Sequence, residues 1–533
     1  MSLSRRQFLG GAAALGLSRG LSGMTALAQM TATPGVDLAL TNGRIHTMDA
    51  NNRIVSQVII RNGRFSEVGT NLTIPANIRT VNLMGKTMIP GLIDAHNHIV
   101  LVGNRPGWHT PLEHVFTIPD AIAELKTRSV EVPRDEFITC IGPVSAMQFA
   151  ERRMPNLTEL DAIDRPVYLQ AAPGGTRTNT KGKAWLEARG VMVAADGAIM
   201  AAGLALQTLR KELLTPETRK RTALGALEYY AKLGITTHRD SGAFHSEGPG
   251  TGIADENTYT MHEPFLALNR EGKLPVRLRL DFLHQDSPTA NPPLPTLSQR
   301  LRNSFPFFGN DWLRTGGIGE FTGGGIEGLR AIAKAGWRGE DHALNLNGAT
   351  ALIRDRETVN AEIPITQLRW IISHIPAFPQ ELADRAHALG MGVLVGWGPL
   401  RTAGQNPSPA GVGPPYKMLV NHPIKTGYHS DGGDITVINP WMNFTTMATG
   451  KNLAGQAILG DQALTRQEVL RMATAANKWF IWEDDLGSIE VGNHADLAVL
   501  DRDVLTVPED DIRKTKSVLT IVGGKVAHND GVM

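Results

Sequence analysis

Residues 88–98 read Met-Ile-Pro-Gly-Leu-Ile-Asp-Ala-His-Asn-His, an apolar run that ends in polar side chains. A short apolar run of this kind is typical of a buried β-strand. Successive side chains of a strand point to opposite faces, so His96 and His98 project in the same direction. Two imidazoles placed in this way can bind one cation, and imidazole nitrogen suits zinc and its first-row neighbours. Two histidines that simply end a strand are the alternative interpretation.

Seven further apolar runs end in polar residues or glycine, and helix-like stretches such as 216–233 and 380–389 lie between most of them. This alternation predicts a parallel α/β sheet. Eight such units predict a (β/α)8 TIM barrel, whose active site lies at the carboxyl ends of its strands. The runs after 88–98 are 235–240, 277–284, 313–321, 337–342, 370–374, 392–397 and 425–431.

Two segments do not fit a simple barrel. The gap between the first two runs is too long for one helix, so an insertion is expected at about 104–215. Residues 398–423 are rich in proline, glycine and asparagine, which predicts a long loop near the site.

Both chain ends are rich in short β-type runs with turn signals, such as Asn42-Gly43, Asn62-Gly63 and Gly523-Gly524. Residues 29–86 and 486–533 are therefore predicted to form one small β-sandwich. The segment 87–485 remains for the barrel and its insertion.

Composition limits the function classes. The 533 residues include 53 Lys+Arg and 52 Asp+Glu, a formal net charge of +1. This balance argues against a nucleic-acid-binding protein, which usually has a strong basic bias. Cys140 is the single cysteine, so neither an intrachain disulfide nor a cysteine-rich zinc site can form. Any metal must be bound by histidines and carboxylates.

The N-terminal residues 1–28 have the pattern of a twin-arginine signal peptide. Arg5-Arg6 precedes an apolar stretch that ends in Ala26-Leu27-Ala28. A membrane anchor or amphipathic helix is the alternative, but glycine and serine interrupt the apolar run well below the roughly 20 residues that a span needs. The mature chain is predicted to begin near Gln29, to be periplasmic or secreted, and to have no membrane association.

Three more strand ends carry residues that can bind metal. His342 ends the fifth run, His374 the sixth and Asp431 the eighth. Taken singly, each is most often an ordinary loop or core residue. Together with His96 and His98, they form a set of four histidines and one aspartate at the predicted edge of the barrel.

These strand ends resemble the metal-binding motifs of the amidohydrolase superfamily. The resemblance rests on MIPGLIDAHNH, EDHAL (340–344), IISHI (371–375) and HSDGG (429–433), and also on the runs 40–69 and 464–501. It extends over nearly all of the mature chain. The branch that it resembles most has a large insertion after the first strand and includes N-substituted formamide deformylases and D-aminoacylase-like metal-dependent hydrolases.

The resemblance implies a role for each matching residue. His96 and His98 would bind the more buried ion, while His342 and His374 would bind a second ion or orient the substrate. Asp431 would bind metal and act as general base. Many relatives have a carboxylated lysine on the fourth strand, but residues 313–320 contain no lysine. Glu320 is therefore predicted to bridge the metals, with an ordinary salt bridge as the alternative.

The expected cofactor is one or two divalent ions, with zinc as the first choice. Such an ion lowers the pKa of a bound water molecule from about 15.7 to near 7. Asp431 would take a proton from this metal-activated water and pass it to the leaving nitrogen. The predicted reaction is hydrolysis of a C–N amide-like bond, other than a peptide bond, in a small-molecule substrate.

The substrate class remains open because the sequence departs from the branch at three places: Leu344-Asn345 and Ser373 replace a Gly-Asp pair and a glutamate, and Gly174-Gly175 replaces Gly-His. A hydrolytic deaminase, a lactone or ester hydrolase, and an inactive metal-binding relative are the alternatives. His238, His284 and His429, at other strand ends, are predicted to contact substrate or to make hydrogen bonds at the edge of the barrel. Assembly into a homo-oligomer is left open.

Overall fold

The computed structural model describes residues 37–103, 105–171, 175–242, 261–284, 297–396, 398, 414–433 and 436–533. The predicted signal peptide and most of the predicted loop at 398–423 lie outside these residues. Among the described helices, none combines the length and the apolar character that crossing a bilayer requires.

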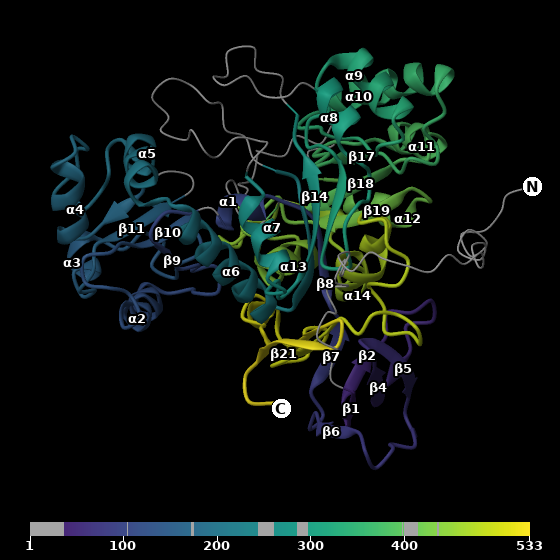
Figure 1. Cartoon of the computed structure of the whole chain (residues 1–533), viewed down its shortest axis with the longest axis horizontal. Coiled ribbons are helices and arrows are strands. Elements are labelled where there is room, and N and C mark those ends of the chain that lie inside the picture. Colours follow the sequence, from purple (N-terminus) through teal and green to yellow (C-terminus); the bar gives the residue numbers. More distant parts are fainter. Residues whose placement is uncertain are drawn as a thin grey trace, which may run out of the picture. The chain divides into compact units, whose positions relative to one another are not determined.

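Eight parallel strands form two four-stranded sheets, each in the order of the chain. The first sheet is β8 (Leu92–Asn97), β13 (Ile235–Asp240), β14 (Arg277–Phe282) and β15 (Leu313–Ile318). The second is β16 (Glu340–His342), β17 (Ile371–Ser373), β18 (Gly392–Gly396) and β19 (Lys425–His429). Figure 1 labels β8 and β14 of the first sheet and β17, β18 and β19 of the second. Each strand falls within one of the predicted runs.

The two parallel sheets are hydrogen-bonded to each other at both edges. The Ile318 amide donates to the carbonyl of Arg338 at 2.9 Å, and the Asp431 amide donates to the carbonyl of His96 at 3.1 Å. All eight carboxyl ends therefore lie at the same end of a TIM-barrel-like arrangement. The residues that follow the strands are consequently brought close together.

Helices follow most of these strands, and their local sequences explain where they begin. In α6, the Thr215 side chain accepts a hydrogen bond from the Thr218 amide, and Pro216 occupies the first turn. The helices of this region are α1 (Ile99–Gly103), α6 (Pro216–Lys232), α7 (Glu263–Arg270), α8 (Leu297–Asn303), α9 (Gly325–Lys334), α10 (Leu346–Glu362), α11 (Gln380–Ala388), α12 (Tyr416–Asn421), α13 (Pro440–Thr449) and α14 (Arg466–Arg471).

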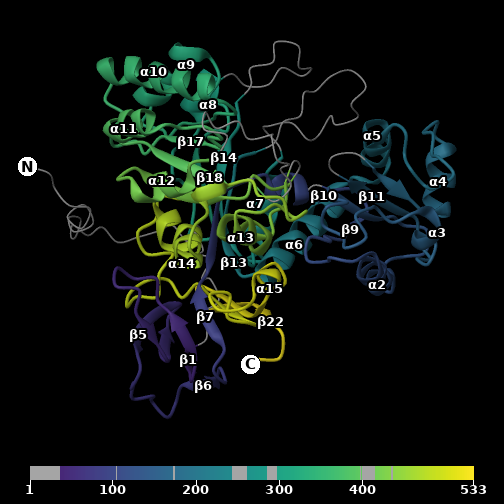
Figure 2. The same cartoon turned by 180° about the vertical axis from the view of Figure 1, so that it is seen from behind.

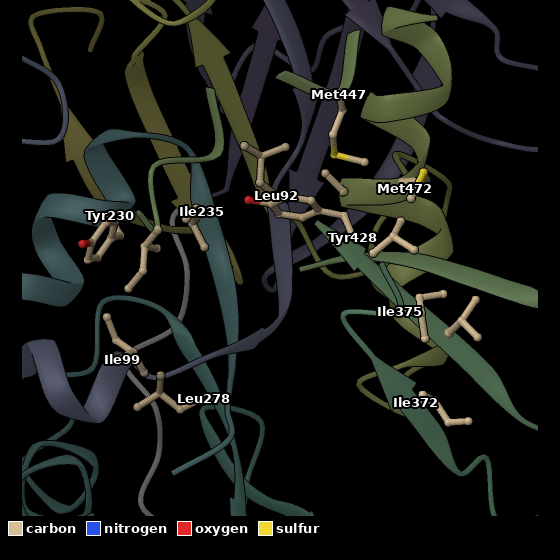
Figure 3. Close-up of a cluster of buried hydrophobic side chains, with 14 of the residues drawn as sticks. Leu92, Ile99, Tyr230, Ile235, Leu278, Ile372, Ile375, Tyr428, Met447 and Met472 are labelled. Carbon is tan, nitrogen blue, oxygen red and sulfur yellow. The ribbon is translucent and has the colours of Figure 1, made fainter. Parts of the chain in front are cut away.

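One large hydrophobic cluster joins the strands and helices. Leu92, Ile235 and Leu278 come from the first sheet, and Ile372 and Tyr428 from the second (Figure 3). All are almost fully buried. Full burial of such a side chain is worth about 1.5–3 kcal/mol, so the two sheets share a substantial part of their stabilisation.

The elements of residues 105–213 form a group that can be followed in Figures 1 and 2. This group has two hydrophobic clusters of its own. The buried Glu113 connects this group to the parallel strands and their helices. It accepts hydrogen bonds from Tyr230 Oη at 2.9 Å and from the Asn439 amide at 2.6 Å. Burial raises the pKa of Glu113 to about 7. The elements are β9 (Trp108–His109), α2 (Ile118–Ser129), β10 (Ile138–Val144), α3 (Leu157–Leu160), β11 (Val167–Ala171), β12 (Arg177–Thr178), α4 (Thr180–Glu187) and α5 (Ala202–Leu213).

Strands from both chain ends form two further sheets that share a hydrophobic core. Leu40 and Val58 of one sheet pack with Leu497 and Ile521 of the other. One sheet is β5-β4-β1-β6 and the other is β22-β21-β20-β7-β2-β3. Their bounds are β1 (Leu38–Thr41), β2 (Arg44–His46), β3 (Ile54–Val55), β4 (Gln57–Arg61), β5 (Arg64–Gly69), β6 (Arg79–Asn82), β7 (Thr87–Pro90), β20 (Leu497–Leu500), β21 (Ser517–Val522) and β22 (Lys525–Asn529); the helix α15 (Glu509–Ile512) lies between β20 and β21.

The run 88–98 was expected to be one strand, but it forms two. Its first part, β7, pairs with β20, whereas β8 pairs with β13. Gly91 separates them, and a Cβ at this position would lie 2.2 Å from Thr236 Oγ1. Only glycine lets the backbone pass so closely. The prediction of a single strand is therefore wrong at this point, although His96 still lies near the end of a buried strand and His98 directly follows that strand.

Candidate metal centre

The structure brings all six predicted metal ligands together at the carboxyl ends of the parallel strands. Five are nearly fully buried, and the side chain of His342 is 25% exposed. They form two groups, and Glu320 belongs to both. Within each group, the possible ligand atoms all lie within 4.8 Å of one another. The first group is His96, His98, Glu320 and Asp431, and the second is Glu320, His342 and His374.

In the first group, both histidines direct Nε2 toward the carboxylates. His96 Nε2 lies 3.2 Å from Asp431 Oδ1, and His98 Nε2 lies 3.3 Å from the same oxygen. His98 Nε2 is also 3.2 Å from Glu320 Oε2. Two imidazole nitrogens and two carboxylate oxygens therefore converge, which is a donor set that suits zinc and related ions.

The second group uses the other oxygen of Glu320. Oε1 lies 2.6 Å from His342 Nδ1 and 2.9 Å from His374 Nε2. Glu320 thus presents one oxygen to each pair of histidines. This is the arrangement that a bridging carboxylate needs, and the bridging role of Glu320 stays a prediction.

Two of the ligand residues have unusual backbone conformations. His374 has φ = 72° and Asp431 has φ = 53°. Both values lie in the left-handed region, which residues other than glycine rarely adopt. Two hydrogen bonds fix the backbone at Asp431. The Asp431 amide donates to the carbonyl oxygen of His96, and the amide of the preceding Ser430 donates to Asp94 Oδ1 at 3.0 Å. Strained residues of this kind concentrate at functional sites.

The far nitrogens of the first two histidines are also engaged. His96 Nδ1 donates to Glu340 Oε1 at 2.6 Å, and His98 Nδ1 donates to the carbonyl oxygen of Gly242 at 2.5 Å. Each bond would leave the Nε2 lone pair directed at a metal ion in the cluster. Metal-binding histidines characteristically have such a partner on the second nitrogen.

The charges of the cluster also call for a cation. Burial opposes ionisation of Glu320, but hydrogen bonds from His342, His374 and His98 hold its pKa well below the usual range. For Asp431, burial is likewise outweighed by His374, His96 and His98, and its pKa is lowered. The same carboxylates raise the pKa of His96 and of His98, so without a metal the compensating positive charge is carried by protons on these imidazoles, in the place that a divalent cation would take. The residues therefore fit one or two divalent cations.

The three histidines predicted to contact substrate are all buried. The Asn97 side-chain amide donates to His238 Nδ1 at 2.9 Å, and burial lowers the pKa of His238 to about 3. The His284 amide donates to the carbonyl of Phe321 at 3.2 Å. The ring of His429 packs 5.1 Å from that of His96 and 4.9 Å from that of His374. Their contact with substrate remains a prediction.

Sequence reasoning missed Glu340, the carboxylate behind His96. It lies two residues before His342 in β16, so both side chains point to the same face of the strand. This alternation along the strand is the sequence pattern that could have indicated Glu340. Its pairing with His96 depends on how β8 and β16 approach each other across the interior, and no pattern in the sequence gives that approach.

Comparison with known proteins shows which family the chain resembles. The model of the Amidohydrolase family matches residues 79–528. An N-substituted formamide deformylase from Arthrobacter pascens is 28% identical over 142 residues, which cover 25% of this chain and 26% of the deformylase. The protein LONG AFTER FAR-RED 3 from Arabidopsis thaliana is 27% identical over 335 residues, which cover 56% of this chain and 53% of the plant protein. The matches thus span between a quarter and about half of these relatives.

Solved structures give the same fold. A mutant atrazine chlorohydrolase from Arthrobacter aurescens, crystallised with zinc and atraton, aligns with a TM-score of 0.58 and 16% identity. The alignment covers 92% of this chain and 95% of the chlorohydrolase. The TIM-barrel-like α/β fold is therefore shared. The predicted resemblance is confirmed, and the chain belongs to the amidohydrolase family.

Proposed function

We propose that this protein is a metal-dependent hydrolase that cleaves a C–N amide-like bond, other than a peptide bond, in a small molecule. The observation that carries the proposal is the position of Glu320, whose two oxygens face two separate pairs of histidines. Asp431 lies beside the first pair and supplies the acid–base group that hydrolysis requires.

The ligand assignment follows from the two groups. His96, His98, Glu320 and Asp431 would hold one divalent ion, and Glu320 with His342 and His374 would hold a second. We propose zinc, on the basis of the nitrogen and carboxylate donors and of the zinc in the related chlorohydrolase. A divalent ion held by these residues would lower the pKa of water to near 7 and would polarise a substrate carbonyl.

Asp431 is proposed to accept the proton of the attacking water and to deliver it to the leaving nitrogen. As an aspartate, it is ionised at neutral pH, and its carboxylate oxygens can accept a proton. The hydrogen bonds that fix its backbone keep this carboxylate close to His96 and His98. A positioned acid–base group of this kind contributes about 10²–10⁴-fold to a rate.

The architecture that we propose around this site is a closed (β/α)8 barrel of residues 87–485 with an insertion at about 104–215. The hydrogen bonds at both edges of the two parallel sheets support closure. A composite β-sandwich from both chain ends is supported by their shared core. We also retain the proposals of a twin-arginine signal over 1–28 and of export to the periplasm or medium.

Hydrolysis of a panel of compounds before and after metal removal tests this function. The panel contains N-substituted formamides and other amides, hydantoins, lactones and aminopyrimidines. We expect hydrolysis of at least one amide-like compound, its loss after dialysis against a chelator, and its recovery on addition of zinc. Hydrolysis that persists without metal would contradict the mechanism. Activity restricted to lactones or aminopyrimidines would select one of the alternative reactions on the same site.

A further inference from the structure

A fully buried carboxylate, that of Glu340, lies directly behind His96, the histidine near the end of β8. Its Oε1 accepts the hydrogen bond from His96 Nδ1 at 2.6 Å. Its Oε2 pairs with the Arg239 guanidinium. His98 has a different partner, the carbonyl oxygen of Gly242. The two neighbouring histidines are thus oriented by groups of different charge.

A buried ion network surrounds Glu340. Arg239 Nε donates to Asp281 Oδ1 at 3.2 Å, and Arg239 Nη1 donates to the carbonyl of Ala95 at 3.0 Å. Arg338 Nη2 lies 3.8 Å from Asp281 Oδ1. Two arginines and two carboxylates are all fully buried. Their charges balance, so Glu340 can remain ionised without contact with water.

We propose that Glu340 is a positioning residue that fixes the tautomer of His96 for metal binding. An ionised carboxylate can only accept hydrogen bonds, so the proton of His96 must reside on Nδ1. The lone pair of Nε2 is then directed at the group formed with His98, Glu320 and Asp431. The negative charge of Glu340 also makes the imidazole a stronger ligand. This inference rests on the proposed function, because it requires that an ion bind at this group.

A purely structural role for Glu340 makes a different prediction. If the carboxylate served only to neutralise Arg239, its replacement would destabilise the fold without changing the affinity of the folded protein for metal. Metal affinity and the ligand-field spectrum of cobalt therefore separate the two roles. Neither measurement requires a known substrate.

The test compares Glu340→Gln with the unmodified protein and with a matched control, Glu483→Gln. Glutamine keeps the size of the side chain but removes its charge. Glu483 is also a buried carboxylate paired with arginines, Arg279 at 2.8 Å and Arg314 at 2.9 Å, and it is not among the candidate metal ligands. The metal-free form of each protein is titrated with Co²⁺, which gives the affinity for cobalt and the visible absorption spectrum of the bound ion. The midpoint of unfolding of each protein is measured as well.

We expect Glu340→Gln to bind the cobalt ion of the group that contains His96 about 10–100-fold more weakly than the unmodified protein does. The visible absorption spectrum of this bound cobalt should also change. Glu483→Gln should retain both properties of the unmodified protein. Unchanged affinity and spectrum in a folded Glu340→Gln variant would overturn the inference alone. Absence of cobalt binding to a folded, unmodified protein would contradict both the inference and the proposed function.

A second variant covers the case in which the single substitution prevents folding. The double variant Arg239→Gln with Glu340→Gln removes one charge of each sign, so the remaining pair of Asp281 and Arg338 stays balanced. We expect the same loss of cobalt affinity. Full affinity in the double variant, or failure of both variants to fold while Glu483→Gln folds, would overturn the positioning role.

Discussion

The variant Asp431→Asn is expected to fold normally and to lose most of its hydrolytic activity. An amide side chain has nearly the same size as the carboxylate but cannot accept a proton at neutral pH. We expect kcat to fall by about 10²–10⁴-fold, the range for a positioned acid–base group. The measurement is steady-state hydrolysis of the best compound of the panel, with circular dichroism to verify the fold.

Asp496→Asn serves as the matched control for this substitution. Asp496 is also a buried aspartate, but it pairs with Arg277 at 2.8 Å, in contact with the C-terminal strands instead of the metal ligands. Below its unfolding temperature, this variant should keep the kcat of the unmodified protein. A folded Asp431→Asn variant with unchanged kcat would exclude the aspartate as general base.

The variant Glu320→Ala is expected to lower the number of bound divalent ions from about two to one or fewer. Removal of the side chain takes one oxygen from each group of ligands. His342 and His374 would then lack the carboxylate that completes their group. Titration of the metal-free protein with Co²⁺, followed by absorption, gives the number of equivalents bound.

Glu483→Ala, which removes a buried glutamate paired with Arg279 and Arg314, is the control and should bind as many ions as the unmodified protein. If Glu320→Ala also binds as many ions as the unmodified protein, Glu320 does not bridge metals. A single ion in both the variant and the unmodified protein would indicate a mononuclear site with Glu320 outside it.

Much of the candidate site could be predicted from the sequence because its residues follow strands. An apolar run that ends in histidine or aspartate indicates a strand end directly, and parallel strands bring such ends together. His342, His374 and Asp431 could therefore be assigned to one site although they come from three separate strands. Glu320 was accessible through its place after the fourth strand.

Other features depend on approaches between distant segments. Gly91 divides an apolar run that reads as a single strand, and the reason is the closeness of Thr236, which is 145 residues away in the chain. The pairing of Glu340 with His96 joins residues that are 244 positions apart. Strands such as β9 and β12, of two residues each, are too short to produce a periodic pattern. Local patterns carry no information on such contacts.

The metal content of the untagged protein, purified without chelators and measured by mass spectrometry, tests the central claim most directly. The two groups of ligands that share Glu320 predict about two divalent ions per chain. A folded protein that contains no divalent metal, and takes up none when zinc is added, would contradict the account.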